Sequence, residues 1–156
     1  MDTAYKTTLE LDKVLNRAVQ LCACQETKEM MQALEPAPTI EDERYDLTQT
    51  NAINALLIKN GSPRFGSVRE VRRIVAHARK GGILSMGELL EIAATLRNFS
   101  GLSQWYGLSE HEMLPTDDLF FALAPQPVLE KQISESILSP EEMADTASVT
   151  LHDLRR

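Results

Sequence analysis

The stretch PRFGSVREVRRIVAHARKGGILSMGELLEIAATLR, residues 63–97, has the highest density of helix start and stop signals in the sequence. Ser67 and Glu70 have the spacing of a capping box, in which each residue satisfies a backbone N–H of the other. The apolar residues that follow recur at helical spacing and predict one buried face: Val68, Val71, Ile74, Val75 and Ala78. Gly81-Gly82 ends this helix, because glycine adopts the left-handed C′ conformation at little cost.

A second helix follows almost at once. Ser85 and Glu88 repeat the capping-box spacing, and the helix is expected to bury Leu89, Leu90, Ala93, Leu96 and Phe99. Two helices joined by so short a link form a hairpin or a sharp corner. Gly101 weakens the pattern, so the periodicity leaves open whether this helix reaches Trp105 and Tyr106.

Two helices are expected near the N-terminus. Thr7 and Glu10 form a capping-box pair, followed by a stripe of Leu11, Val14, Leu15, Ala18, Leu21 and Cys22. A shorter helical pattern covers Glu26 to Leu34. Pro36 ends it, since proline lacks an N–H and disfavours helical geometry in the residue before it.

The longest helix is expected from Ile40 to about Asn60, with Thr39 as its cap and Asp42 reaching back to it. Its first turn is acidic, as the helix dipole favours. The expected buried stripe is Ile40, Leu47, Ala55 and Ile58, joined by Ile53, Leu56 and Leu57.

The C-terminal third predicts a brief helix from Leu114 to Leu123 and another from Val128 to Ile137. Residues 137–147 allow either a helical turn or a small β-hairpin. Ser148 is expected to cap a final helix that continues only to Arg156, too short to be stable alone.

Together these patterns predict an all-α fold, an antiparallel helical bundle of about six to seven helices. We divide the chain into a helical core, residues 1–147, and the start of a longer helix, residues 148–156. The apolar content of 43% can supply a core. The aromatic content of only 5% favours helices over a β-sandwich.

Composition limits the compartment and the partners. The net charge of −7 argues against a surface that binds nucleic acid everywhere, although a local patch remains open. Cys22 and Cys24 cannot form a disulfide framework and indicate a reducing compartment. There is no leader-like N-terminus and no apolar run near the ~20 residues that span a bilayer. We therefore expect a cytoplasmic protein without membrane contact.

No catalytic, cofactor-binding or metal-binding residues are predicted in this chain. The phosphate-binding and zinc-protease motifs are absent, and His77, His111 and His152 lie in no ligand spacing. Cys22 falls on an apolar stripe, so a structural cysteine is favoured over a metal ligand.

One surface feature indicates a binding site. Six basic residues cluster between residues 64 and 80, where Glu70 is the one acidic residue: Arg64, Arg69, Arg72, Arg73, Arg79 and Lys80. On the expected helix, Arg69, Arg72, Arg73 and His77 lie away from the apolar stripe. The face could bind nucleic-acid phosphates. Alternatively, it is a solvated face that balances the acidic helices.

Several stretches, in this order and spacing, resemble one family. They are Leu9–Leu15 (LELDKVL), Phe65–Val71 (FGSVREV), Lys80–Ser85 with Glu88–Arg97 (KGGILS, then ELLEIAATLR), and Ala147–Arg156 (ASVTLHDLRR). The first resembles the characteristic opening of the second MutS group, MutS-II, bacterial relatives of the mismatch-repair ATPase. The other three are similar to the F-G-G-I-R-D-I, K-G-G-V-L-S…E-L-L-x-I-A-x-T-L-R and A-S-P-x-L-x-x-I-R-R segments of that group. Ser67 stands for the usual Gly and Val149 for the usual Pro.

The resemblance implies a non-catalytic N-terminal core of a DNA-binding protein. The full protein would be a homodimer with a helical core, a coiled-coil clamp, an ATPase that uses ATP and Mg²⁺, and usually a C-terminal Smr nuclease domain. It implies binding of branched DNA, endonuclease activity, suppression of recombination, or splitting of collided ribosomes through rRNA. The mismatch-reading domain of true MutS is absent from this group.

Three functions follow as hypotheses. The chain couples the ATPase to the clamp, contacts nucleic acid or rRNA directly, or is a helical protein–protein interaction module without ATPase partner domains.

Overall fold

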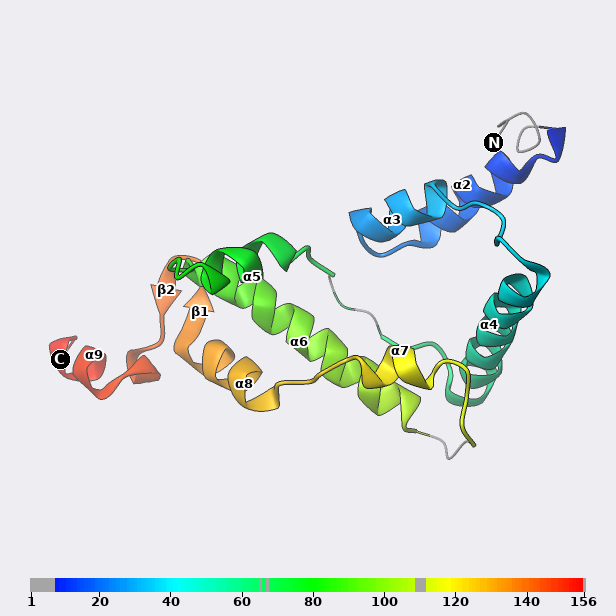
Figure 1. Cartoon of the computed structure of the whole chain (residues 1–156). Helices are drawn as coiled ribbons and strands as arrows, with labels where there is room; N and C mark the ends of the chain where they lie inside the picture. Colours follow the sequence, from blue (N-terminus) through cyan, green and yellow to red (C-terminus); the bar gives the residue numbers. More distant parts are fainter. Residues whose placement is uncertain (1–7, 65, 67, 109–111, 156) are drawn as a thin grey trace. The chain divides into compact units, whose positions relative to one another are not determined.

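The computed structural model describes residues 8–64, 66, 68–108 and 112–155 (Figure 1). The predicted all-α class, with one small β-hairpin, is confirmed. The elements are α2 (Leu11–Leu21), α3 (Gln25–Gln32), α4 (Ile40–Asn60), α5 (Arg72–Arg79), α6 (Met86–Tyr106), α7 (Asp117–Phe121), α8 (Pro127–Ser136), β1 (Ile137–Ser139), β2 (Glu142–Met143), the 3₁₀ turn η1 (Asp145–Ala147) and α9 (Val149–Leu154). Each helix in the described ranges is too short or too polar to cross a bilayer.

Two compact units divide the chain, residues 1–43 and 44–156. In the first unit, α2 packs against α3 and buries Leu15, while Val14 and Leu21 are exposed. The predicted capping box of Thr7 and Glu10 stays a prediction. Glu10 is itself the residue before α2, with a positive φ of 56° and no capping bond, and Thr7 lies outside the described residues.

Helix α4 has the predicted bounds and the predicted cap. The Asp42 backbone N–H donates to Thr39 Oγ1 at 3.1 Å, and that hydroxyl donates to the Asp42 carboxylate at 2.8 Å.

The predicted buried stripe of α4 is right in one half and wrong in the other. Leu56 is buried, and Ile53 and Leu57 pack in its cluster, as expected. The other four residues are exposed: Ile40, Leu47, Ala55 and Ile58. The second unit therefore packs against the Leu56 side of α4 and not against the side of Leu47 and Ile58.

Helix α5 starts later than predicted. It begins at Arg72 after Val71, which provides no side-chain cap; Glu70 lies before the helix, and Ser67 is outside the described residues. Of the predicted buried face, Ile74 alone is buried. Val68 and Val71 are half-buried, and Val75 and Ala78 are exposed.

The stop at Gly81-Gly82 is confirmed. Gly81 has a φ of 81°, its N–H donates to Ala78 O at 2.9 Å, and the Gly82 N–H donates to His77 O at 3.1 Å. This pair of bonds is a Schellman motif. Figure 1 shows the chain reversing direction here, so of the two expected arrangements, a hairpin or a sharp corner, α5 and α6 form the hairpin.

Helix α6 opens with the predicted capping box. The Ser85 N–H donates to Glu88 Oε2 at 2.7 Å, and the Glu88 N–H donates to Ser85 Oγ at 3.3 Å. The helix continues through Gly101 to Tyr106, which settles the length that the sequence left open.

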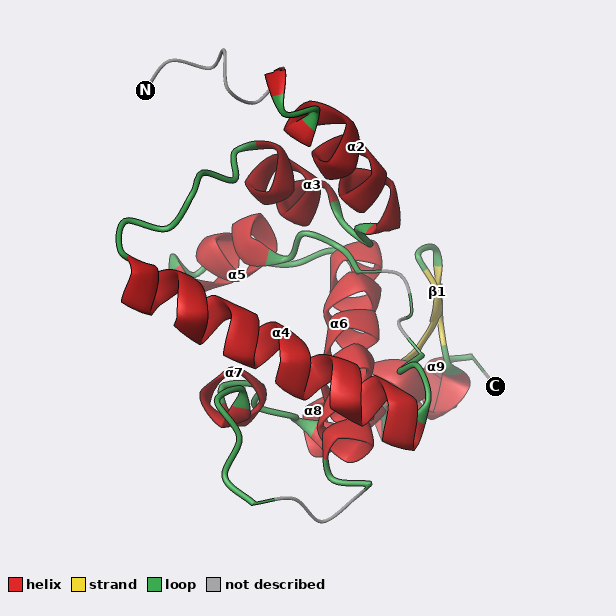
Figure 2. Ribbon diagram, turned by 90° about the vertical axis from the view of Figure 1, so that its right-hand side faces the viewer, coloured by secondary structure: helices red, strands yellow, loops and turns green. Residues whose placement is uncertain are grey.

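Two apolar clusters lie along α6. One contains Ala93 with Ile133 and Ile137 of the α8–β1 segment, with Met86, Leu89, Leu90 and Ile92 packed around them. The other contains Trp105 and Tyr106 with Leu56 of α4, surrounded by Ile53, Leu57, Leu114 and Phe120. Helix α6 thus connects α8 to α4 and α7 (Figure 2).

The hairpin alternative for residues 137–147 is the one observed. Strands β1 and β2 pair antiparallel, with Ile137 opposite Met143. Ser148 caps α9 as predicted, accepting a 3.1 Å bond from the Leu151 N–H. Arg155 donates to Met143 O at 3.0 Å, which joins α9 to the hairpin. The predicted core and long-helix division at residue 148 stays a prediction.

Candidate nucleic-acid interface

The six predicted basic residues lie on one short segment around α5. Arg64 and Arg69 precede the helix, Arg72 and Arg73 begin it, Arg79 ends it and Lys80 follows it. All six are exposed: Arg64, Arg69, Arg72, Arg73, Arg79 and Lys80. We call this set the basic segment.

The helical part of the basic segment faces away from the core. At about 100° per residue, Arg73 and Lys80 lie on one side of α5, with Arg72 and Arg79 beside them. Ile74, the buried residue, lies on the opposite side. The predicted exposed basic face is therefore present, but Arg69 is not on the helix.

The ion pair of Arg73 does little to neutralise its charge. Arg73 Nε lies 4.0 Å from Glu70 Oε2, and with the arginine side chain 91% exposed this pair is weak. Arg72 and Arg73 also occupy the first turn of α5, which contains no acidic residue. Cations are unfavourable there, because the positive end of the helix dipole lies at the N-terminus. The interaction of Arg72 and Arg73 with the helix dipole therefore does not stabilise α5.

Two contacts hold the ends of this segment. The Gly66 N–H donates to Asn98 Oδ1 at 2.9 Å, which fixes the approach to α5 against α6. At the other end, the Schellman motif places Lys80 directly before the turn, and the His77 ring lies where a Cβ on Gly82 would be. A side chain at Gly66 would displace Asn98, and one at Gly82 would displace His77.

The potential metal-binding groups in the described residues include the two cysteines. In the described part of the chain, no three His, Cys, Asp or Glu side chains are placed to hold a metal ion. Cys22 and Cys24 are free and half-buried; the Cys22 thiol donates to Ala18 O at 3.4 Å, and Cys24 Sγ lies 3.0 Å from Thr27 Oγ1. His111 is outside the described residues.

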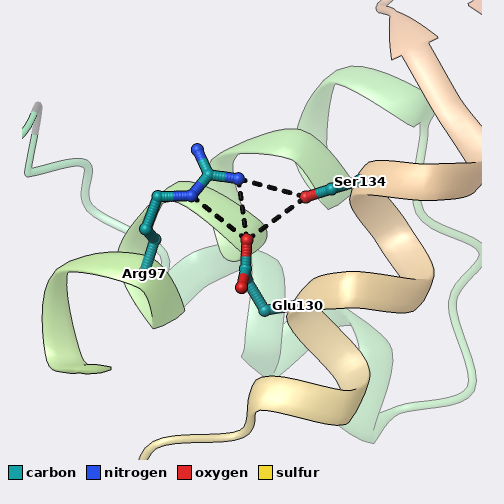
Figure 3. A network of polar contacts seen from close by, with 3 residues as sticks. All are labelled: Arg97, Glu130 and Ser134. Atoms are coloured by element: carbon teal, nitrogen blue, oxygen red, sulfur yellow. Dashed lines mark hydrogen bonds and ion pairs between the residues drawn. The ribbon is translucent and has the colours of Figure 1, made fainter. Parts of the chain in front are cut away.

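Sequence reasoning missed a polar network between α6 and α8. Arg97 donates to Glu130 Oε1 from Nε at 3.1 Å and from Nη2 at 2.7 Å, and Nη2 also donates to Ser134 Oγ at 3.1 Å (Figure 3). Glu130 and Ser134 are one helical turn apart, so both point at the same arginine. No local pattern pairs residues so distant in sequence.

A second missed network surrounds Tyr106. Its hydroxyl donates to Asp117 Oδ1 at 2.6 Å and lies 2.9 Å from Thr116 Oγ1, while its ring stacks on Phe120 at 3.8 Å. Asp117 Oδ2 accepts from the Leu114 N–H at 3.1 Å. Burial, and then the bond to Asp117, raises the pKa of Tyr106 above its usual 10.0. The network holds the start of α7 against the end of α6.

Comparison with known proteins gives one consistent result. No family model and no solved structure matches the chain. A protein named Endonuclease MutS2 from Ruminiclostridium cellulolyticum is 31% identical over 158 residues, covering 100% of this chain and 20% of the relative. The proteins of the same name from Clostridium beijerinckii and Halothermothrix orenii are 29% and 28% identical, over 95% and 100% of this chain.

The matched region is a small part of those relatives. The chain spans 19% of the length of the Clostridium beijerinckii protein and 21% of the Halothermothrix orenii protein. Along essentially its whole length, the chain is related to one segment of proteins named Endonuclease MutS2.

Proposed function

We propose that this chain serves as a non-catalytic core segment of a protein of the MutS-II group, and that it couples an ATPase to a clamp. The observation that supports this most is the similarity at about 30% identity from end to end with a segment of proteins named Endonuclease MutS2. The motif order around Gly81-Gly82 and Ser85 agrees with it.

The construction of α6 supports a mechanical role. It is a continuous helix from Met86 to Tyr106, about 30 Å long at 1.5 Å per residue. One end packs on α8, where Arg97 holds Glu130, and the other packs on α4 and α7 through Trp105 and Tyr106. A helix held at both ends can pass a displacement from one side of the unit to the other.

The chemistry would belong to other parts of the whole protein. This chain has no G-x-x-x-x-G-K-[ST] motif, the loop that holds the phosphates of ATP and its Mg²⁺, so its residues do not fit that group. ATP hydrolysis, endonuclease activity, homodimerisation and action on branched DNA or ribosomes are part of the proposal for the whole protein, as is a cytoplasmic location.

Two experiments test this proposal. In-frame translation of the DNA beyond the Arg156 codon should reveal a Walker motif; a stop codon there would contradict it. Hydrogen exchange on the whole protein, with and without a non-hydrolysable ATP analogue, should then change within residues 63–156. Identical protection throughout that range would rule out the coupling role.

Direct contact with nucleic acid is a second candidate, favoured by one observation. Arg72 and Arg73 occupy the first turn of α5, where the helix dipole disfavours them, and the basic segment is exposed along its length. Exposed arginines bind phosphate oxygens without reading the base sequence.

A titration against branched DNA and rRNA at two salt concentrations tests this candidate. Arg69→Ala with Arg73→Ala should weaken binding and reduce the slope of log K against log salt by about 0.9 for each lost phosphate contact. The matched control removes two exposed cations elsewhere, Arg17→Ala with Lys131→Ala. Equal binding by the two double variants would exclude the basic segment.

A further inference from the structure

A hollow with a volume of about 500 Å³ lies between α4 and the start of α7. Its lining combines three apolar side chains with three amides: Ile53, Leu57, Leu119, Gln49, Asn51 and Asn54. The other lining residues are threonines, so no charged side chain lines it. The hollow is open to solvent, since Leu119 is 58% exposed. We call it the α4–α7 groove.

The amides of the groove have hydrogen-bonding groups that the fold does not use. The Gln49 amide nitrogen donates to Pro115 O at 3.0 Å and to the Tyr45 hydroxyl at 3.3 Å, so its Oε1 remains as an acceptor. The side chains of Asn51 and Asn54 have no hydrogen-bond partner among residues 8–64, 66, 68–108 and 112–155. Each of these two amides can donate and accept at the same time.

The two asparagines do not stabilise the helix that carries them. Asn51 and Asn54 lie in the interior of α4, away from both of its ends. Asparagine is less favourable there than alanine, because its side chain forms hydrogen bonds with the backbone in conformations that compete with the helix. A ligand of the groove therefore explains these amides better than the stability of α4 does.

We propose that the α4–α7 groove binds an extended segment of another protein, apolar in character and with a basic residue at one end. A peptide group has one N–H and one C=O, and a single amide side chain can bind both. From Gln49 to Leu57 the groove follows α4 for about 12 Å, the length of about four extended residues. Alternate side chains of such a segment point to one side, where Ile53 and Leu119 can receive them.

The charge beside the groove selects a basic residue. Asp46 lies one helical turn before Thr50, on the row of α4 that continues to Ile53 and Leu57. Its carboxylate is exposed and has no ion-pair partner in the part of the chain that the structure describes. A lysine or arginine at the end of the bound segment would be attracted to this carboxylate, and an acidic residue would be repelled.

The lining is less suited to a nucleobase, the other planar group that amides recognise. Proteins hold unstacked bases by stacking them on aromatic rings or on the guanidinium group of arginine. The groove residues that the structure describes include neither. Asp46 would also repel the phosphates of a nucleic acid. The inference does not depend on the relationship to the MutS-II group.

Fluorescence anisotropy with two labelled peptides tests the proposal on this chain. Each peptide alternates leucine with serine over about six residues, and the two carry a lysine at opposite ends. One of them should bind saturably, with a dissociation constant below about 1 mM. N-methylation of its backbone should weaken binding at least about tenfold, because the groove amides lose their donors. Glutamate in place of the lysine should weaken it about threefold.

Variants locate the binding in the groove. Asn51→Ala with Asn54→Ala should raise the dissociation constant at least about tenfold, with helix content unchanged in circular dichroism, because alanine favours the helix. The matched control, Asn16→Ala with Gln20→Ala, removes two exposed amides from α2 and should leave it within about twofold. Asp46→Asn should abolish the preference for lysine over glutamate.

Three results would overturn the proposal. They are no saturable binding of either peptide, equal weakening by the two double variants, and binding that N-methylation leaves unchanged. A single-stranded oligonucleotide of mixed sequence should not displace the bound peptide. If it does, and if Asn51→Ala with Asn54→Ala weakens the binding of the oligonucleotide, the groove binds nucleic acid and the peptide proposal is wrong.

Discussion

Replacing Tyr106 by phenylalanine removes one hydroxyl and keeps the ring that stacks on Phe120. The lost bond to Asp117 is short, at 2.6 Å, and its acceptor is a carboxylate; such bonds contribute about 1.5–3 kcal/mol. Thr116, which has no exposed surface, loses its neighbour as well. We expect Tyr106→Phe to reduce the free energy of unfolding by about 2 kcal/mol at neutral pH.

The same variant predicts a pH dependence. Burial raises the folded-state pKa of Tyr106 above 10.0, so the neutral phenol stabilises the fold at every pH below its ordinary value. That stabilisation is lost as the pH rises through the folded-state pKa. The difference in stability between the wild type and Tyr106→Phe should therefore shrink above about pH 10.

Urea denaturation followed by fluorescence measures both effects, because Trp105 is the one tryptophan in the chain and lies 6.1 Å from Phe120. Tyr45→Phe is the control. That hydroxyl makes a longer bond, 3.3 Å to Pro115 O, on a residue 52% exposed, and its loss should cost less than about 0.5 kcal/mol. The reasoning fails if the two variants are equally stable, or if the effect of Tyr106→Phe does not change with pH.

The remaining predictions concern the turn and the two ends of α6. Gly81→Ala should cost about 1 kcal/mol in urea denaturation, because alanine is strained at a φ of 81°, although no atom obstructs its Cβ. Ser85→Ala should cost about 1 kcal/mol by loss of the cap; no change in the urea midpoint would disprove the capping role. The hydrogen bond from the Ser85 backbone is the main cause that lowers the pKa of Glu88 below 4.5. The wild type should therefore be more stable than Glu88→Gln above pH 4.5, and this difference should disappear as the pH falls through the folded-state pKa. Acid titration of both proteins measures it. Arg97→Ala should cost at most about 1 kcal/mol, since the arginine is 63% exposed, and a double-mutant cycle with Glu130→Gln should show that the two effects are coupled.

Local structures were predicted correctly where a few neighbouring residues form hydrogen bonds with one another. The Ser85–Glu88 box, the Thr39–Asp42 cap and the stop at Gly81 depend on hydrogen bonds within three to five residues, so the sequence contains them in full. The same reasoning failed before α5. There a bond from Gly66 to Asn98, distant in sequence, holds the chain in a loop up to Val71.

Packing could not be predicted in the same way. Periodicity placed Leu47, Leu56 and Ile58 of α4 in the core together, but only the tertiary arrangement selects Leu56 from among them. Arg97 and Glu130 meet because α6 and α8 pack in one register, and no spacing rule encodes that contact. The basic segment was identified correctly as exposed, although its helix begins at Arg72; its binding role stays a prediction.

The two apolar clusters of the second unit have a consequence for cooperativity. They share α6 but no residue among those that pack in them, so a loss of contacts around Ile133 need not disturb the packing around Trp105. The α8–hairpin end should open in sub-global unfolding at a lower free energy than the aromatic end, where buried hydrogen bonds reinforce the packing. Amide protons of α8 should then exchange before those at the end of α6, although both belong to one compact unit.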